Sequence, residues 1–105
     1  MLNAEGASVG IYLDASAREV WVLGEKVTRE LSKLEFDFLS LLYGRSGEVV
    51  PSDEIGNTLW GAGGYDVNML HQLVARVKDK IEPDASQPHF VMNVRGVGYK
   101  LQRSS

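Results

Sequence analysis

Two side-chain amides and a guanidinium recur at one-turn spacing in the second half of the chain. Asn68, Gln72 and Arg76 follow one another at intervals of four residues. Since four residues make about one turn of an α-helix, a helix here places the three groups on one side. A carboxamide can pair bidentately with the adenine edge in the major groove, and Arg can pair with guanine or bind a phosphate. The pattern therefore indicates chemistry suited to reading a nucleic acid.

The segment that carries these groups, residues 66–82, is predicted to be an α-helix with one buried face. Leu70, Val74, Val77 and Ile81 recur at the spacing that stacks side chains on one side of a helix. The two amides fall on the opposite side of this apolar stripe, at about 100° of rotation per residue. The same helix therefore supplies both core and an exposed polar face.

The charges on this helix leave its role open. Its basic residues are Arg76, Lys78 and Lys80, and its acidic residues are Asp66, Asp79 and Glu82. The helix is thus formally neutral, whereas a DNA-reading helix usually carries surplus positive charge. Taken alone, the pattern also fits an ordinary amphipathic helix whose polar side is solvated.

The chain as a whole, residues 1–105, has the size and composition of one globular domain. Its net charge of −3 and its pI near 5.3 argue against a polyanion partner. The charge is unevenly distributed, because residues 1–65 hold five basic and ten acidic side chains and residues 66–105 hold six basic and four acidic. The C-terminal part, at +2, is the part expected to face a polyanion.

Other classes of function have little support in the sequence. The absence of cysteine excludes thiolate metal sites, and no metal or other cofactor is expected. Glu35 and Asp37 are better explained as a helix cap and a solvated carboxylate than as a catalytic pair, and His71 and His89 as surface or packing residues. We therefore expect that the protein is not an enzyme. The sequence has neither a signal peptide nor an apolar segment of about 20 residues, so we expect no membrane partner and a cytoplasmic protein.

An antiparallel sheet over about residues 9–30 and a helix over about 32–45 are predicted for the first half. Three strands are expected, at residues 9–14, 19–23 and 26–30, because these stretches are separated by turn-forming residues. Ser32 and Glu35 have the spacing of a capping box, which marks the start of the first helix. Its apolar face is the most hydrophobic of the chain and is expected to be the centre of the core.

The second half begins with a short strand at residues 48–50 and a helix at about 52–60. Ser52 is the expected N-cap, and Gly56 is expected to weaken the helix. The glycine-rich segment before residue 66 lacks the ending of a P-loop and is interpreted as a flexible connector. A hairpin is predicted over about residues 89–103, with Arg95 projecting from its turn and both turn glycines free to take positive φ.

In this order, the elements compose an α+β winged helix-turn-helix domain with an N-terminal antiparallel sheet, three helices and a C-terminal β-hairpin wing. The sequence resembles the effector domain of OmpR/PhoB-type response regulators, the output domain of two-component systems. The strongest match is Asn93 to Lys100, NVRGVGYK, and the likeness extends from about Val9 to Leu101. Further matches are Leu31-Ser32 with Glu35-Phe36, residues 47–50 and Trp60-Gly61.

The resemblance implies sequence-specific binding of double-stranded DNA in transcriptional control, often as a head-to-tail homodimer. It makes Arg76 a phosphate or base contact and Arg95 the residue that reaches the minor groove. Asn93 stands at a wing position that touches phosphate, and Trp60 at one that packs near the DNA backbone. Residues of the connector correspond to a loop that contacts RNA polymerase in some members: Gly61, Gly63, Gly64 and Tyr65. Lys78 and Lys80 complete the set of candidate DNA-binding residues.

Three departures from the family pattern favour DNA binding that is weaker and steeply salt-sensitive, or that depends on dimerisation. Asp79 stands where a cation is usual, Ala75 where a basic or polar residue is frequent, and Ser52 where an Arg is usual. The alternative is a winged-helix protein–protein interaction module, with Met69, Leu73 and Ala75 forming an apolar contact at the edge of the exposed face. The chain contains no receiver-type acidic pocket, so we expect either a fragment of a larger regulator or a free-standing variant. DNA binding further requires that the exposed face of residues 66–82 lie beside the wing.

Overall fold

A computed structural model of the protein describes residues 10–45 and 47–103, which form two antiparallel sheets and three helices. The N-terminal sheet has the order β1-β2-β3, with β1 at Ile11–Asp14, β2 at Glu19–Val22 and β3 at Glu25–Lys26. The helices are α2 at Lys33–Gly44, α3 at Ser52–Trp60 and α4 at Val67–Ile81. The C-terminal sheet has the order β4-β6-β5, with β4 at Val50–Pro51, β5 at Val91–Val94 and β6 at Gly98–Leu101.

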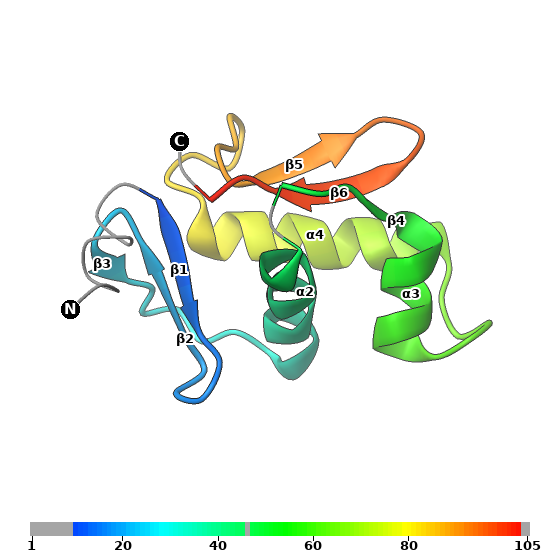
Figure 1. Cartoon of the computed structure of the whole chain (residues 1–105), viewed down its shortest axis with the longest axis horizontal. Coiled ribbons are helices and arrows are strands. Elements are labelled where there is room, and N and C mark those ends of the chain that lie inside the picture. Colours follow the sequence, from blue (N-terminus) through cyan, green and yellow to red (C-terminus); the bar gives the residue numbers. More distant parts are fainter. Residues whose placement is uncertain (1–9, 46, 104–105) are drawn as a thin grey trace.

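This architecture confirms the predicted winged helix-turn-helix. Figure 1 shows α4 lying along the C-terminal sheet, with α3 near the start of α4 and the N-terminal sheet near its end. Val9, the first residue of the predicted sheet, lies outside the described residues. Within the described part of the chain, no helix is both long and apolar enough to cross a bilayer.

The N-terminal sheet ends sooner than the sequence indicated. The third strand was predicted over residues 26–30, but β3 covers only Glu25–Lys26. Beyond it the chain leaves the sheet and runs beside α4, where the Glu30 carbonyl oxygen accepts a hydrogen bond from Lys80 Nζ at 2.9 Å. The last hydrogen bond to β2 runs from the Val27 amide to the Val20 carbonyl oxygen at 2.8 Å, and the segment that follows is held against α4.

The capping box at the start of α2 is confirmed, and α2 lies at the centre of the core. The Glu35 amide donates to the Ser32 hydroxyl at 3.2 Å, and the Ser32 amide donates to the Glu35 carboxylate at 2.9 Å. Phe38, Leu39 and Leu42 of the same helix are fully buried. The cap thus starts the helix at the position that directs its apolar face into the protein.

Glu35 has a second function that the capping pattern did not reveal. Its side chain is only 2% exposed, and its carboxylate binds Lys80 Nζ at 2.7 Å and Arg76 Nε at 3.2 Å. Burial raises the pKa of Glu35, but the hydrogen bonds from Lys80, the Ser32 amide and Arg76 and the charge of Lys80 outweigh it and hold the pKa below its ordinary value. Two partly buried ion pairs therefore join the start of α2 to α4.

The predicted helical range 52–60 is confirmed for α3, but its predicted cap is wrong. Ser52 is the first helical residue and Pro51 is the N-cap, with no side-chain cap bond. The predicted strand 48–50 is likewise displaced to Val50–Pro51. The reason is that the pairing of β4 with β6 continues through Pro51, after which the Ser52 amide donates to the Val97 carbonyl oxygen at 3.0 Å.

Gly56 makes room for an aromatic side chain. A Cβ at this position would lie 2.2 Å from the ring of Tyr65. That ring stacks on Trp60, with centroids 6.1 Å apart, and its hydroxyl donates to the Asp53 carboxylate at 2.6 Å. Gly56, which was expected to weaken α3, therefore leaves the space in which the ring of Tyr65 packs. This packing holds the connector that follows α3 against the helix.

We predict that Gly56→Ala lowers the free energy of unfolding by about 1–3 kcal/mol, because the overpacking outweighs the gain in helix propensity. Chemical denaturation measures the difference. Gly44→Ala is the matched control, since a Cβ there would meet no atom within 4 Å apart from its chain neighbours and the backbone of its own helix. Equal effects of the two substitutions would contradict a steric role for Gly56.

We predict that Glu35→Gln destabilises the fold by about 1–3 kcal/mol at neutral pH, because it leaves Lys80 without its buried anion. The folded-state pKa of Glu35 is lowered, so its contribution is complete above the ordinary value of 4.5 and is lost as the pH falls through the folded-state pKa. The difference between wild type and variant should narrow accordingly in denaturation curves at decreasing pH.

Asp37→Asn removes the same charge from the same helix at an exposed pair with Lys33 and serves as the control. It should cost little at any pH. A pH-independent difference for Glu35→Gln would contradict the role of its charge.

Candidate nucleic-acid interface

The two amides of α4 lie on its exposed side, as predicted. Asn68 and Gln72 are exposed, whereas Leu70, Leu73 and Val77 on the opposite side have no exposed surface. The helix begins where Asp66 caps it, since the Asp66 carboxylate accepts from the Met69 amide at 3.0 Å. The cap and the apolar stripe together determine which side of α4 faces solvent.

The hairpin β5–β6 carries Arg95 at its turn. The Val97 amide donates to the Val94 carbonyl oxygen at 2.9 Å, and Gly96 between them has a φ of +78°. Gly98 was also expected to be free to take a positive φ, but its φ is not positive. A Cβ there would lie 2.0 Å from the Val50 carbonyl oxygen, so this glycine is required by the close approach of β4.

The start of α4 and the wing border one open groove. It is lined by Ser52 and Asp53 of α3, by Val67 and His71 of α4, and by wing residues that include Asn93, Arg95 and Val97. Figure 1 shows the turn of the wing and the beginning of α4 at the same end of the molecule, beside α3. The start of α4 therefore lies beside the wing through Val67 and His71, whereas Asn68, Gln72 and Arg76 do not line this groove.

The three cations of α4 occupy different environments. Lys80 is only 20% exposed and is engaged by both Glu35 and the Glu30 carbonyl, so it is not part of the interface that we propose below. Arg76 also binds Glu35, yet about half of its side chain, 52%, is exposed. Lys78 is half-buried. Sequence spacing alone did not show that Lys80 is held inside the protein whereas Arg76 remains half-exposed to solvent.

The three acidic residues at positions 66–82 each accept a hydrogen bond from another group of the protein. Asp66 caps α4, and Asp79 pairs with Arg29 at 2.9 Å. Glu82, which the sequence counted among the surface charges, is 7% exposed and accepts hydrogen bonds from the amides of residues 89–91 at distances from 2.8 to 3.3 Å. Glu82 therefore secures the start of β5 and does not face a ligand.

The connector between α3 and α4 is anchored at its end. Trp60 and Tyr65 stack on each other, and the hydrogen bond to Asp53 raises the pKa of the Tyr65 hydroxyl. Gly61 and Gly63 have positive φ and are exposed, as is Gly64, where a Cβ would lie 2.5 Å from the Trp60 carbonyl oxygen. The interpretation as a flexible connector is therefore wrong at Tyr65, because this ring is held on α3.

Catalytic or metal chemistry finds little support in this geometry. His71 lines the groove together with Asp53, but no hydrogen bond joins them within residues 10–45 and 47–103. Over the same residues, no group of three His, Asp or Glu side chains is arranged to hold a metal ion. The groove brings together the Arg95 cation, the Asn93 amide, the Asp53 carboxylate and apolar side chains such as Val67 and Val97, which suit a binding surface.

Comparison with known proteins points to transcriptional regulators. Residues 24–101 match the family model described as transcriptional regulatory protein, C terminal. The sensory transduction protein RegX3 of Mycolicibacterium smegmatis is 37% identical over 93 residues, which cover 88% of this chain and 40% of that protein. The DNA-binding response regulator MtrA of the same organism is 35% identical over 99 residues, covering 92% and 42%. The chain thus spans about two fifths of the length of these relatives.

Solved structures show the same fold. The Klebsiella pneumoniae RstA DNA-binding domain in complex with the RstA box superposes with a TM-score of 0.75 at 27% identity, covering 89% of this chain and 91% of that one. The Thermotoga maritima response regulator DrrB, an OmpR/PhoB homologue, has a TM-score of 0.76 at 26% identity, covering 89% and 44%. The family match and these likenesses together show that the chain belongs to the C-terminal DNA-binding domains of OmpR/PhoB-type transcriptional regulators.

Proposed function

We propose that this domain binds double-stranded DNA sequence-specifically, with α4 in the major groove and the β5–β6 wing in the adjacent minor groove. The observation that carries the proposal is the groove bordered by both the start of α4 and Arg95 of the wing. One duplex can meet both surfaces only if they lie on the same side of the domain.

The proposed contacts form two groups: one recognises the bases of the DNA, and the other binds the DNA backbone and positions the domain. Asn68 and Gln72 are exposed and read base edges, with adenine as the favoured partner of a carboxamide. Arg76, Lys78 and Asn93 contact phosphates or, for Arg76, a base. Arg95 enters the minor groove. We further propose that Trp60, which is half-buried against Tyr65, packs close to the DNA backbone.

The environments of the acidic residues and of Leu73 bear on the choice between DNA and a protein partner. Of the acids counted on α4, Glu82 is buried against backbone amides and Asp79 pairs with Arg29, whereas Asp66 is an exposed carboxylate at the cap. Arg76 and Lys80 are in turn paired with Glu35. The alternative also required an apolar patch that included Leu73, which is fully buried. The arrangement therefore favours DNA binding over the protein–protein interaction module.

The remaining partners are further proposals. Gly61, Gly63 and Gly64 form an exposed segment next to the anchored Tyr65, which suits a contact with RNA polymerase. A head-to-tail homodimer on DNA would add avidity to a domain with few free cations. A DNA partner also favours the cytoplasm, and the relatives' greater length favours a role as the output unit of a longer regulator.

Selection of bound duplexes from a random pool by the purified chain tests the proposal directly. We expect enrichment of one site, and a fall of log K with log salt at a slope of about −3.6 if about four phosphates are neutralised. A pool without enrichment, together with binding that is absent at low ionic strength, would refute DNA binding by this chain.

We predict that Arg95→Ala weakens binding to the selected duplex by about tenfold and makes the salt slope about 0.9 less steep, since one contact to the backbone region is lost. Fluorescence anisotropy at several salt concentrations measures both effects. Lys26→Ala removes the same charge from the N-terminal sheet, where Lys26 pairs with Glu19. Its affinity should stay close to that of wild type, and an equal loss would remove the wing from the mechanism.

We predict that Gln72→Ala weakens binding to the preferred site by about 1–3 kcal/mol and relaxes the preference at a single base pair, because a bidentate base contact is lost. Binding to a panel of single-substituted duplexes measures this change. Gln102→Ala, at an exposed residue after β6, is the matched control. A uniform loss over all duplexes would instead assign Gln72 to the phosphates.

A further inference from the structure

Asp79 places a carboxylate on the side of α4 that is proposed to meet DNA. It lies seven residues after Gln72, about two helical turns further along the same exposed stripe, and its side chain is 64% exposed. An unpaired carboxylate at this position would repel phosphates instead of releasing counterions. DNA binding by α4 is therefore favoured if a positive charge lies next to the Asp79 carboxylate.

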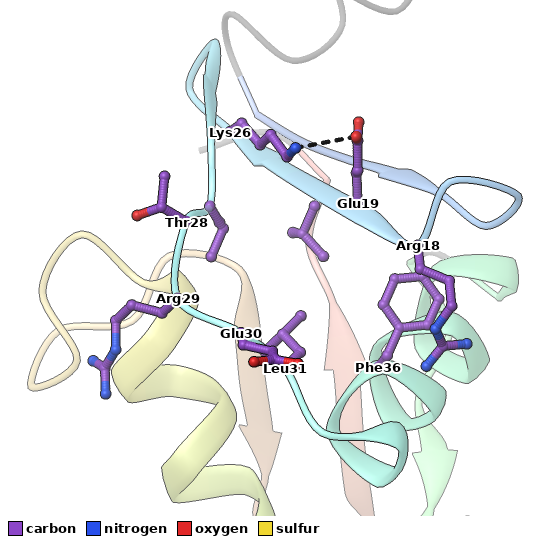
Figure 2. A pocket seen from close by; sticks show the side chains of 10 residues that line it. Arg18, Glu19, Lys26, Thr28, Arg29, Glu30, Leu31 and Phe36 are labelled. Atoms are coloured by element: carbon purple, nitrogen blue, oxygen red, sulfur yellow. Dashed lines mark ion pairs between the residues drawn. The ribbon is translucent and has the colours of Figure 1, made fainter.

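Arg29 supplies that charge from a distant part of the chain. It lies in the segment between β3 and α2, and Figure 2 shows it reaching from this segment toward α4. Its Nη1 donates to Asp79 Oδ2 at 2.9 Å and to the Asp79 carbonyl oxygen at 3.1 Å. The next residue, Glu30, accepts at its carbonyl from Lys80 at 2.9 Å. Two neighbouring residues of the segment are thus tied to two neighbouring residues of α4.

The exposure of the pair argues against a mainly structural role. Both side chains are more than half exposed, at 56% for Arg29 and 64% for Asp79, and such ion pairs add little to stability in water. Their effect on a polyanion differs, because a charge within the Debye length of about 8 Å acts directly on bound phosphates. The pair therefore matters most when DNA is present.

We propose that Arg29 is a positioning residue for DNA binding, which neutralises Asp79 and holds its carboxylate against the C-terminal end of α4. The inference rests on the proposed function. It assigns a role in the interface to the segment between β3 and α2. It also explains how a helix with an acid in place of the usual cation retains a surface that DNA can approach.

A double-mutant cycle on the selected duplex tests the inference, with Arg29→Ala, Asp79→Asn and the double variant measured by fluorescence anisotropy. We expect Arg29→Ala to weaken binding several-fold, because Asp79 is then unpaired. In the Asp79→Asn background the same substitution should cost less. Lys26→Ala removes the same charge from the neighbouring strand β3 without releasing Asp79, and should leave the affinity near that of wild type.

Each outcome of the cycle is decisive. An equal or larger loss from Arg29→Ala in the Asp79→Asn background overturns the inference, because Arg29 would then act on DNA by itself. Unchanged affinity of Arg29→Ala also overturns it. Thermal melting by circular dichroism shows whether each variant is folded at the assay temperature, so a loss caused by unfolding counts against the inference. Failure of the wild-type chain to bind any duplex is a separate result that refutes the proposed function.

Discussion

The carboxylate of Glu35 is shared among three donors that come from two helices, and the rest of the domain depends on this junction. It accepts from the Ser32 amide at the start of α2 and from Arg76 and Lys80 of α4. A buried carboxylate is costly unless it is paired and hydrogen-bonded, so α2 and α4 cannot rotate or slide independently. The junction therefore reinforces the orientation of α4 that its apolar stripe sets, and it leaves Arg76 half-exposed beside the solvent-facing side.

Close approaches of backbone and aromatic rings complete the scaffold at the other end of α4. Gly56 admits the ring of Tyr65 onto α3, and Gly98 lets β6 lie against the carbonyl of Val50. Both contacts place elements that border the groove, because the first holds the connector before α4 and the second holds the wing beside β4. A side chain added at either glycine would displace the Tyr65 ring or the Val50 backbone, and with it an element that borders the groove.

The electrostatic character of the domain follows from which charges are bound. The chain has a net charge of −3, yet Glu35 and Glu82 are buried, Asp66 caps α4 and Asp79 pairs with Arg29. A count of formal charges therefore misstates the field at α4 in both directions, because Arg76 and Lys80 are also paired with Glu35. The groove beside α4 combines the Arg95 cation and the Asn93 amide with the Asp53 carboxylate, and its apolar lining includes the exposed side chains of Val67 and Val97.

The sequence by itself determined the elements whose signals are local. The capping box at Ser32, the apolar stripe of α4 and the hairpin around Gly96 depend on residues a few positions apart, and the structure has each of them at the predicted place. Only the tertiary structure decided which groups pair with Glu82, Lys80 and Asp79. It also decided that Tyr65 packs on Gly56 and that Pro51 is the N-cap of α3. Lys80 and Asp79 pair with residues that are 45 and 50 positions away in the chain, and the cap of α3 depends on the pairing of β4 with β6. The contacts of Glu82 and Tyr65 join neighbouring elements across a connecting segment. A charge or a glycine carries no local signal of the group that will pack against it, so these contacts become visible only when the helices and sheets are in place.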